Sequence, residues 1–172
     1  MKEEYILQNM MTCIGNKRKL LNYIENIIEE IKILLNKDKL VIMDAFIGSS
    51  VVSRMLSYHS SKLITNDLEK YSYIMGLCYL KTPNKKDGDK INKLIDEINE
   101  KLENNDLKSG IISETYAPND TNDIKEGERC FYTKENAMRI DTIRDYINEL
   151  PKKYRDYVMG NLLVKSSIHT NT

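Results

Sequence analysis

Helical and strand-like patterns of hydrophobic residues alternate in the first half of the chain. Between about Lys17 and Leu35, aliphatic residues recur every three or four positions, which predicts an amphipathic helix that ends at Asn36-Lys37-Asp38. The continuous apolar run Leu40–Met43 predicts a short strand that is buried on both faces of a parallel sheet. A second short strand is expected at Lys62–Thr65.

Helical spacing returns after each of these strands. Gly48 provides a turn, and the hydroxyl groups of Ser49 and Ser50 are suited to helix capping, so a helix is expected to begin near one of these serines. The next helical pattern runs from Leu68 to Leu80, with its apolar stripe on Tyr71, Ile74, Leu77 and Cys78. The expected arrangement is a right-handed strand-helix-strand unit with parallel strands.

The second half of the chain is predicted to be mainly helical. One amphipathic pattern covers Ile91–Leu102, after turn residues at Asp87-Gly88. A further helix is expected to start at Thr133 as N-cap, and another at Pro151.

Two segments of the second half lack helical spacing. From Ser109 to about Arg129 the apolar residues follow neither a helical nor a strand spacing, which predicts a loop. A loop of this length is uncommon in a compact domain, and we expect it to have a function. Phe131–Thr133 is expected to form a brief strand. With only two or three strands expected, the fold class is α/β, with an incomplete parallel sheet and several helices in one globular unit.

Charge and composition narrow the classes of function. Lys plus Arg and Asp plus Glu both number 26, and this balance argues weakly against a self-sufficient nucleic-acid-binding protein. No apolar run reaches the about 20 residues of a membrane helix, and no secretory signal is recognisable, so no membrane association and a cytoplasmic location are expected. Cys13, Cys78 and Cys130 are far apart, which predicts reduced thiols and no metal site.

A candidate ligand site lies where the two predicted strands end. Asp44 and Gly48 follow the first strand, and Asp67 follows the second at close to the offset of about 20 residues at which an acidic side chain meets a ribose in such folds. A glycine there lets the backbone approach a nucleotide-like ligand. Because Gly48 stands alone, NAD is disfavoured. The alternative is that Gly48 is an ordinary turn glycine, both carboxylates are exposed and Phe46 is a core residue.

Five short segments, in the same order along the chain, resemble the DNA adenine-N6 methyltransferases in which the cofactor motif comes first and the catalytic motif last. Together they span almost the whole sequence. The segments are Ile14–Leu21, Asp44–Arg54, Asn66–Glu69, Gly127–Thr133 followed by Asn136-Ala137, Ile140-Asp141 and Arg144, and Ser167–Thr172.

The resemblance implies a Rossmann-like S-adenosylmethionine methyltransferase fold. The intact enzyme is expected to transfer a methyl group from S-adenosylmethionine to N6 of adenine in duplex DNA, as the protective partner of a restriction–modification system. The implied cofactor-binding residues are Cys13, Lys17, Asp44, Phe46, Gly48 and Asp67, with Asp67 on the ribose. Cys13 departs from the family, in which an aromatic residue is more common at that position.

The family's catalytic tetrapeptide, Asp, Asn or Ser followed by Pro-Pro and an aromatic residue, is absent. Pro83, Pro118 and Pro151 are isolated from one another. Residues 1–172 are therefore expected to form the N-terminal, cofactor-binding part of the enzyme, without catalytic residues, inactive alone and self-associating through exposed strand edges. The alternatives are a cofactor-binding module without activity, a small-molecule methyltransferase on the same fold, and a structural helical protein.

Overall fold

The chain forms two compact units rather than the single globular unit expected from its length. The computed structural model describes residues 5–6, 11, 17–104, 107–168 and 170, and the contacts separate Met1–Thr82 (unit 1) from Pro83–Thr172 (unit 2). Each unit contains a hydrophobic cluster of its own, which explains why the boundary falls at the Thr82-Pro83 break in helical pattern.

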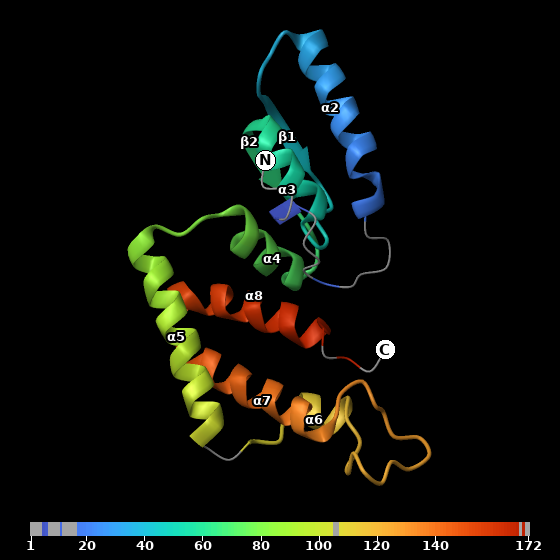
Figure 1. Cartoon of the computed structure of the whole chain (residues 1–172), viewed down its shortest axis with the longest axis vertical. Coiled ribbons are helices and arrows are strands. Elements are labelled where there is room, and N and C mark those ends of the chain that lie inside the picture. Colours follow the sequence, from blue (N-terminus) through green and yellow to red (C-terminus); the bar gives the residue numbers. More distant parts are fainter. Residues whose placement is uncertain (1–4, 7–10, 12–16, 105–106, 169, 171–172) are drawn as a thin grey trace. The chain divides into compact units, whose positions relative to one another are not determined.

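Unit 1 is built around a two-stranded parallel sheet (Figure 1). Strand β1 pairs in parallel with β2, and Asp44 lies opposite Thr65 at their carboxyl ends. The predicted strands, their parallel pairing and the helices around them are confirmed. The elements are η1 (Arg18–Leu20), α2 (Leu21–Leu35), β1 (Leu40–Asp44), α3 (Val51–His59), β2 (Ser60–Thr65) and α4 (Lys70–Leu80).

The core of unit 1 lies on one face of this sheet. Ile42 and Leu63 pack against a cluster of apolar residues from α2 and α3. Val41 and Met43 point to the opposite face and are 69% and 61% exposed. The prediction that β1 is buried on both faces is therefore wrong, because successive side chains of a strand point to opposite faces and α2 and α3 cover only one of them.

Helix α4 buries a different stripe from the one predicted. Its buried residues are Ser72, Ile74, Met75 and Gly76, and of the predicted stripe only Ile74 is among them. The reason is a close approach of the helix at Gly76, where an added Cβ atom would lie 3.0 Å from Cδ1 of Ile47. The small residues of α4 therefore determine which side of the helix packs against the loop after β1.

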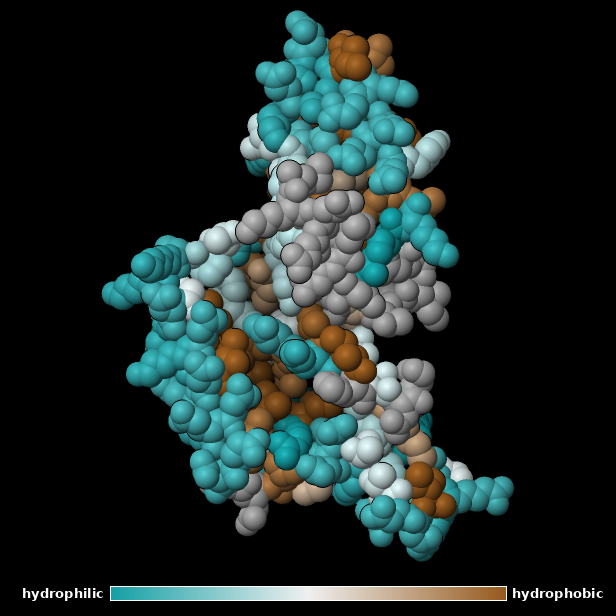
Figure 2. Space-filling view, in the orientation of Figure 1, coloured by the Kyte–Doolittle hydropathy of each residue, from teal (hydrophilic) through white to brown (hydrophobic). Residues whose placement is uncertain are grey.

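Unit 2 is helical in the residues that the structure describes. Helix α5 contacts both α7 and α8, and α6 packs on α7. The helices are α5 (Lys85–Asn104), α6 (Ile111–Thr115), α7 (Lys134–Glu149) and α8 (Lys152–Ile168). On the face shown in Figure 2, apolar side chains gather between α5, α7 and α8, where a cavity of about 190 Å³ is lined mainly by Ile95, Ile98, Ile143, Val158 and Leu162.

Two local predictions for unit 2 are wrong. Asp87-Gly88 lies inside α5 rather than in a turn, because the Asn84 side chain accepts a hydrogen bond from the Asp87 N–H at 3.0 Å and so starts the helix earlier. Phe131–Thr133 forms no strand: the Tyr132 N–H donates to the Tyr116 carbonyl, and the Thr133 carbonyl accepts from the Ala137 N–H at the start of α7.

Other features of unit 2 agree with the sequence. Thr133 is the N-cap of α7, as predicted, and its hydroxyl accepts a hydrogen bond from the Asn136 N–H at 3.2 Å. Cys130, like Cys78 in unit 1, is a thiol. Among the helices that the structure describes, none is long and apolar enough to cross a membrane.

Candidate functional site

The loops that follow β1 and β2 are joined by backbone hydrogen bonds. The Asn66 N–H donates to the Asp44 carbonyl at 2.9 Å, and the Ile47 N–H donates to the Asn66 carbonyl at 3.1 Å. The carboxyl ends of parallel strands meet at one edge of a sheet, which is where open α/β folds bind their ligands. The predicted meeting of the two strand-end segments is confirmed.

Gly48 and Asp67 are in direct contact across this edge. The Gly48 N–H donates to Oδ2 of Asp67 at 2.9 Å, and the Glu69 N–H donates to Oδ1 at 3.0 Å. Gly48 has φ +51°, a left-handed conformation that favours glycine. Hydrogen bonds from the Glu69 and Gly48 backbones hold the pKa of Asp67 below its usual value. The site therefore contains a carboxylate whose ionised form is favoured by backbone N–H donors.

Asp44, at the end of β1, is held by two donors. The Ser53 hydroxyl of α3 donates to Oδ2 at 2.5 Å, and the Phe46 N–H donates to Oδ1 at 3.3 Å. The Phe46 side chain is 88% exposed, so the alternative reading of Phe46 as a core residue is wrong. A second carboxylate thus ends β1, and an exposed aromatic ring lies on the loop that leads from it to Gly48.

Ser50 combines strain with burial at the start of α3. Its φ is +64°, an uncommon conformation for a residue with a side chain, and it is fully buried. Within the described part of the chain its hydroxyl has no hydrogen-bond partner and does not cap the helix. The predicted helix start is confirmed, whereas the predicted capping by Ser50 is wrong. Such strain is often found in ligand-binding loops.

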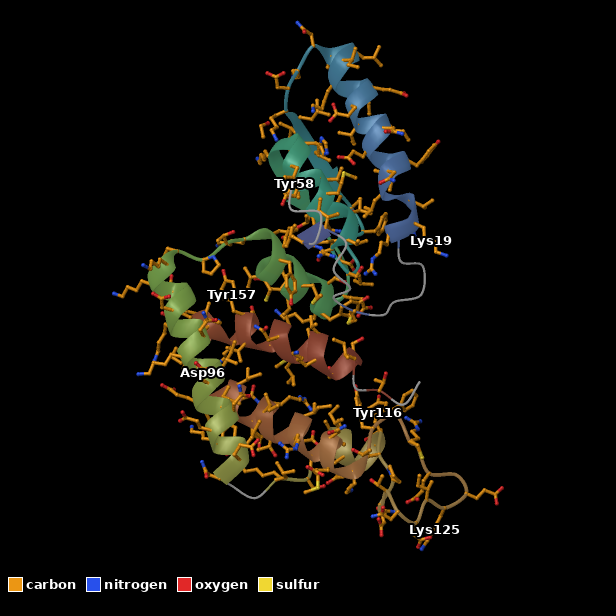
Figure 3. All side chains as sticks on the ribbon, in the orientation of Figure 1. Lys19, Tyr58, Asp96, Tyr116, Lys125 and Tyr157 are labelled. Atoms are coloured by element: carbon orange, nitrogen blue, oxygen red, sulfur yellow. The ribbon has the colours of Figure 1, made fainter. Side chains whose placement is uncertain are left out.

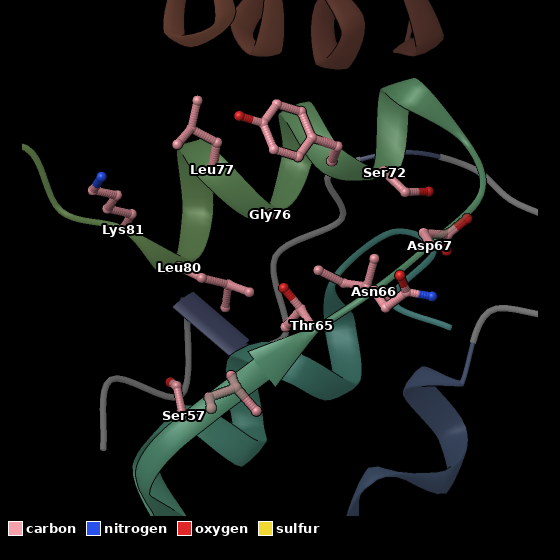
Figure 4. A pocket seen from close by; sticks show the side chains of 12 residues that line it. Ser57, Thr65, Asn66, Asp67, Ser72, Gly76, Leu77, Leu80 and Lys81 are labelled. Atoms are coloured by element: carbon pink, nitrogen blue, oxygen red, sulfur yellow. The ribbon is translucent and has the colours of Figure 1, made fainter. Parts of the chain in front are cut away.

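A cavity of about 450 Å³ adjoins Asp67 between β2 and α4. Figure 4 shows Thr65, Asn66 and Asp67 at the end of β2 on one side, and side chains of α4 on the other. Of the six predicted site residues, Asp67 alone lines it among the residues that the structure describes. The contribution of α4 was not foreseen, although its two small residues four positions apart, Ser72 and Gly76, carry a signal for close approach.

Lys17 is not brought to this edge by the contacts described above. Lys17 is exposed just before η1, where its carbonyl accepts a hydrogen bond from the Leu20 N–H at 2.8 Å. Cys13 lies outside the described residues. Among the residues that the structure does describe, no group of three or more His, Cys, Asp or Glu side chains could hold a metal ion.

The sequence from residue 14 to residue 172 matches the family model of the D12 class N6 adenine-specific DNA methyltransferases. The chain belongs to this family. The resemblance seen in the five sequence segments is thereby confirmed. Membership of this family implies that S-adenosylmethionine is the methyl donor. The helix-rich structure with its small parallel sheet is compatible with a methyltransferase fold.

Three type II methyltransferases are similar to this D12-family chain. It is 30% identical to M.CviAII of Paramecium bursaria Chlorella virus 1, over 95% of this chain and 47% of that protein. It is 31% identical to M.NlaIII of Neisseria lactamica, over 81% of this chain and 38% of the relative. M.FokI of Planomicrobium okeanokoites is 30% identical over 80% of this chain and 21% of its own length. The chain thus spans less than half the length of each relative. No solved structure matches it significantly.

The residues at the strand ends fit S-adenosylmethionine. This cofactor carries a ribose diol and a positively charged methionine portion, and the site presents two separate carboxylates in Asp67 and Asp44. The position of a Cβ atom on Gly48 has no atom within 4 Å, so the loop leaves open space at the glycine. The helix α3 begins directly behind this loop and points its N-terminal N–H groups toward it.

Proposed function

We propose that this chain binds S-adenosylmethionine at the carboxyl ends of β1 and β2, as the cofactor-binding part of a Rossmann-like DNA adenine-N6 methyltransferase. The observation that supports this most directly is the hydrogen bond of 2.9 Å between the Gly48 N–H and the Asp67 carboxylate. It joins the glycine loop to the acidic strand end in a chain that belongs to the D12 family.

Each carboxylate has a separate task in this proposal. Asp67 accepts hydrogen bonds from the ribose hydroxyls, and Asp44 faces the positively charged methionine portion. Phe46 offers an exposed apolar surface beside them. Lys17 and Cys13 complete the proposed cofactor-binding set. The cofactor, when bound, supplies the methyl group.

The reaction proposed for the whole enzyme is methyl transfer to N6 of an adenine flipped out of duplex DNA, as part of restriction–modification. The Pro-Pro-aromatic tetrapeptide is absent from residues 1–172, where all three prolines are isolated. We therefore assign cofactor binding, and not the methyl-transfer step, to these residues. A cofactor-binding module without activity of its own is the second candidate, and the missing tetrapeptide favours it.

Titration calorimetry of the 172-residue chain with S-adenosylmethionine and with its demethylated product tests the binding. We expect both to bind and the Asp67→Ala variant to bind about 1–3 kcal/mol more weakly, because a hydrogen bond to a charged group is lost. The matched control is Asp96→Ala, an exposed aspartate on α5 in unit 2 (Figure 3). Equal affinity of the wild type and Asp67→Ala would remove Asp67 from the site.

Transfer of tritiated methyl groups to unmethylated duplex DNA tests the assignment of the chemistry. Residues 1–172 are expected to give background incorporation because they lack the tetrapeptide. Robust turnover by this chain alone would show that the methyl-transfer residues lie within it.

A further inference from the structure

Ser53 makes an unusual contact for a serine within a helix. It lies in the first turn of α3 and is fully buried. Its hydroxyl donates to Oδ2 of Asp44 at 2.5 Å. A hydroxyl has one proton to donate, so this bond uses the whole donor capacity of the side chain.

Ser57, one turn further along α3, shows the ordinary behaviour. Its hydroxyl donates to the Arg54 carbonyl of its own helix at 2.6 Å. Serines within helices commonly bond a carbonyl three or four residues back. Ser53 instead directs its proton out of α3 to the residue that ends β1, which is a candidate ligand-binding carboxylate.

The contact fixes the orientation of the Asp44 carboxylate. The torsion that rotates a carboxylate is broad and poorly restrained by itself. In this chain Oδ2 is held by Ser53, and Oδ1 accepts the Phe46 N–H at 3.3 Å. With both oxygens held, the plane of the group is set before any ligand arrives, which lowers the cost of ordering it on binding.

We propose that Ser53 is a positioning residue that holds the Asp44 carboxylate toward the positively charged methionine portion of S-adenosylmethionine. This inference rests on the proposed function, since it takes the cofactor site as given. Ser53 acts only through Asp44 and does not touch the cofactor.

Binding measurements with two ligands distinguish this role of Ser53 from a merely structural one. S-adenosylmethionine has the ribose and the positive charge, whereas 5′-methylthioadenosine keeps the nucleoside but lacks the amino acid and the sulfonium charge. We expect Ser53→Ala to bind S-adenosylmethionine about tenfold more weakly and 5′-methylthioadenosine equally well, since only the first ligand uses Asp44. Asp67→Ala is expected to weaken both, because both ligands contain the ribose.

A double-mutant comparison tests the route through Asp44. In the Asp44→Ala background, adding Ser53→Ala is expected to cause no further loss of S-adenosylmethionine affinity. Retained binding of 5′-methylthioadenosine shows that each variant is folded.

The possible results separate a failure of the proposed role of Ser53 from a failure of the proposed cofactor binding. A wild-type chain that binds neither ligand overturns both. If the wild type binds both ligands, an equal loss for the two in Ser53→Ala, or no loss for S-adenosylmethionine, overturns the role of Ser53 and leaves the cofactor site intact. An additive loss in the double variant also overturns it.

Discussion

At the residue scale, the bonding of Asp67 makes the stability of unit 1 depend on pH. Backbone hydrogen bonds from Glu69 and Gly48 hold the pKa of this carboxyl below its ordinary value of 3.8. Because the pKa is depressed in the folded state, the ionised group stabilises the fold above pH 3.8. This contribution is lost as the pH falls through the folded-state pKa.

The Asp67→Asn variant should therefore lose less stability than the wild type on acidification. Denaturant unfolding at about pH 6 and at about pH 3 measures the change in the free energy of unfolding. The control is Asp96→Asn, which makes the same change of charge in unit 2. If the wild type and Asp67→Asn lose equal stability over this range, the backbone hydrogen bonds do not make the carboxylate a stabilising group.

Ser50 is predicted to be a site where substitution stabilises the chain. Its left-handed φ of +64° costs a residue with a side chain about 1 kcal/mol, and its buried hydroxyl adds the cost of desolvation. Ser50→Gly removes both costs at the expense of backbone entropy, so a net gain of about 1 kcal/mol is expected.

Ser50→Ala separates the two contributions, because it removes the hydroxyl and keeps the strain. It should stabilise less than Ser50→Gly in thermal and denaturant unfolding. A loss of stability in Ser50→Gly would contradict the prediction, and an equal loss in Ser50→Ala would mean that the hydroxyl has a stabilising partner.

At the element scale, the short helix α6 depends on a side chain from another helix. Asp141 of α7 is buried, and its carboxylate accepts hydrogen bonds from the Ile112 and Ser113 N–H groups at 3.0 and 2.8 Å. Arg144 lies 3.6 Å from the same carboxylate. An added Cβ on Gly110 would lie 2.8 Å from Cγ of Asp141, so the approach to α6 is close.

Asp141→Ala is expected to destabilise unit 2 by about 2–4 kcal/mol, because two N–H groups in the first turn of α6 lose a charged acceptor. Thermal unfolding followed by circular dichroism measures the change. Asp145→Ala, one turn along the same helix and in an exposed ion pair with Lys108, is the control and should change stability little. Similar losses for the two variants would contradict the capping role of Asp141.

The elements that the sequence predicts well are those with a local cause. The long helices of both units follow from the spacing of their apolar residues, and the two strands follow from short apolar runs that end in polar residues. Helix α6 has five residues, which is too few for a period to be visible, and its cap comes from Asp141, far along the chain. Phe131–Thr133 has strand-like residues but only one backbone bond to Tyr116, so local propensity is not enough.

The candidate site likewise contains some residues that the sequence predicted and others that it did not. The parallel strands predicted that the segments carrying Asp44, Gly48 and Asp67 would lie at one edge of the sheet, and the Gly48 N–H does bond the Asp67 carboxylate there. Their role in cofactor binding stays a prediction. Ser53 was not foreseen as a partner of Asp44, because a buried helix serine carries no sign in the sequence of where its proton goes. The contacts of α4 with the loop after β1 likewise depend on three-dimensional packing.

At the scale of the whole molecule, the balance of charge restricts how this chain could contribute to DNA binding. Lys plus Arg equals Asp plus Glu at 26 each, so no surplus of positive charge is available to attract phosphates. For a chain of a DNA methyltransferase family, this agrees with the proposal that these residues bind the cofactor.

The distribution of apolar side chains in unit 1 predicts self-association. Val41 and Met43 on the exposed face of β1, together with Phe46 and Leu68 in the loops at its edge, leave large hydrophobic side chains in water. The two-stranded sheet also has strand edges that can pair with a second chain. Apolar surface of this kind is commonly buried by association.

The chain is therefore expected to form dimers or larger assemblies that dissociate on dilution, measured by light scattering coupled to size exclusion. Val41→Thr combined with Met43→Thr keeps residues suited to a strand while removing apolar surface, and should shift the population toward a monomer of 20.1 kDa. Ile33→Thr combined with Leu34→Thr, two exposed apolar residues at the end of α2, is the control for a general loss of hydrophobic surface. A wild-type monomer with a sharp transition at high temperature would mean that the exposed face of β1 does not drive association, and that the core between the sheet, α2 and α3 is sufficient to stabilise unit 1.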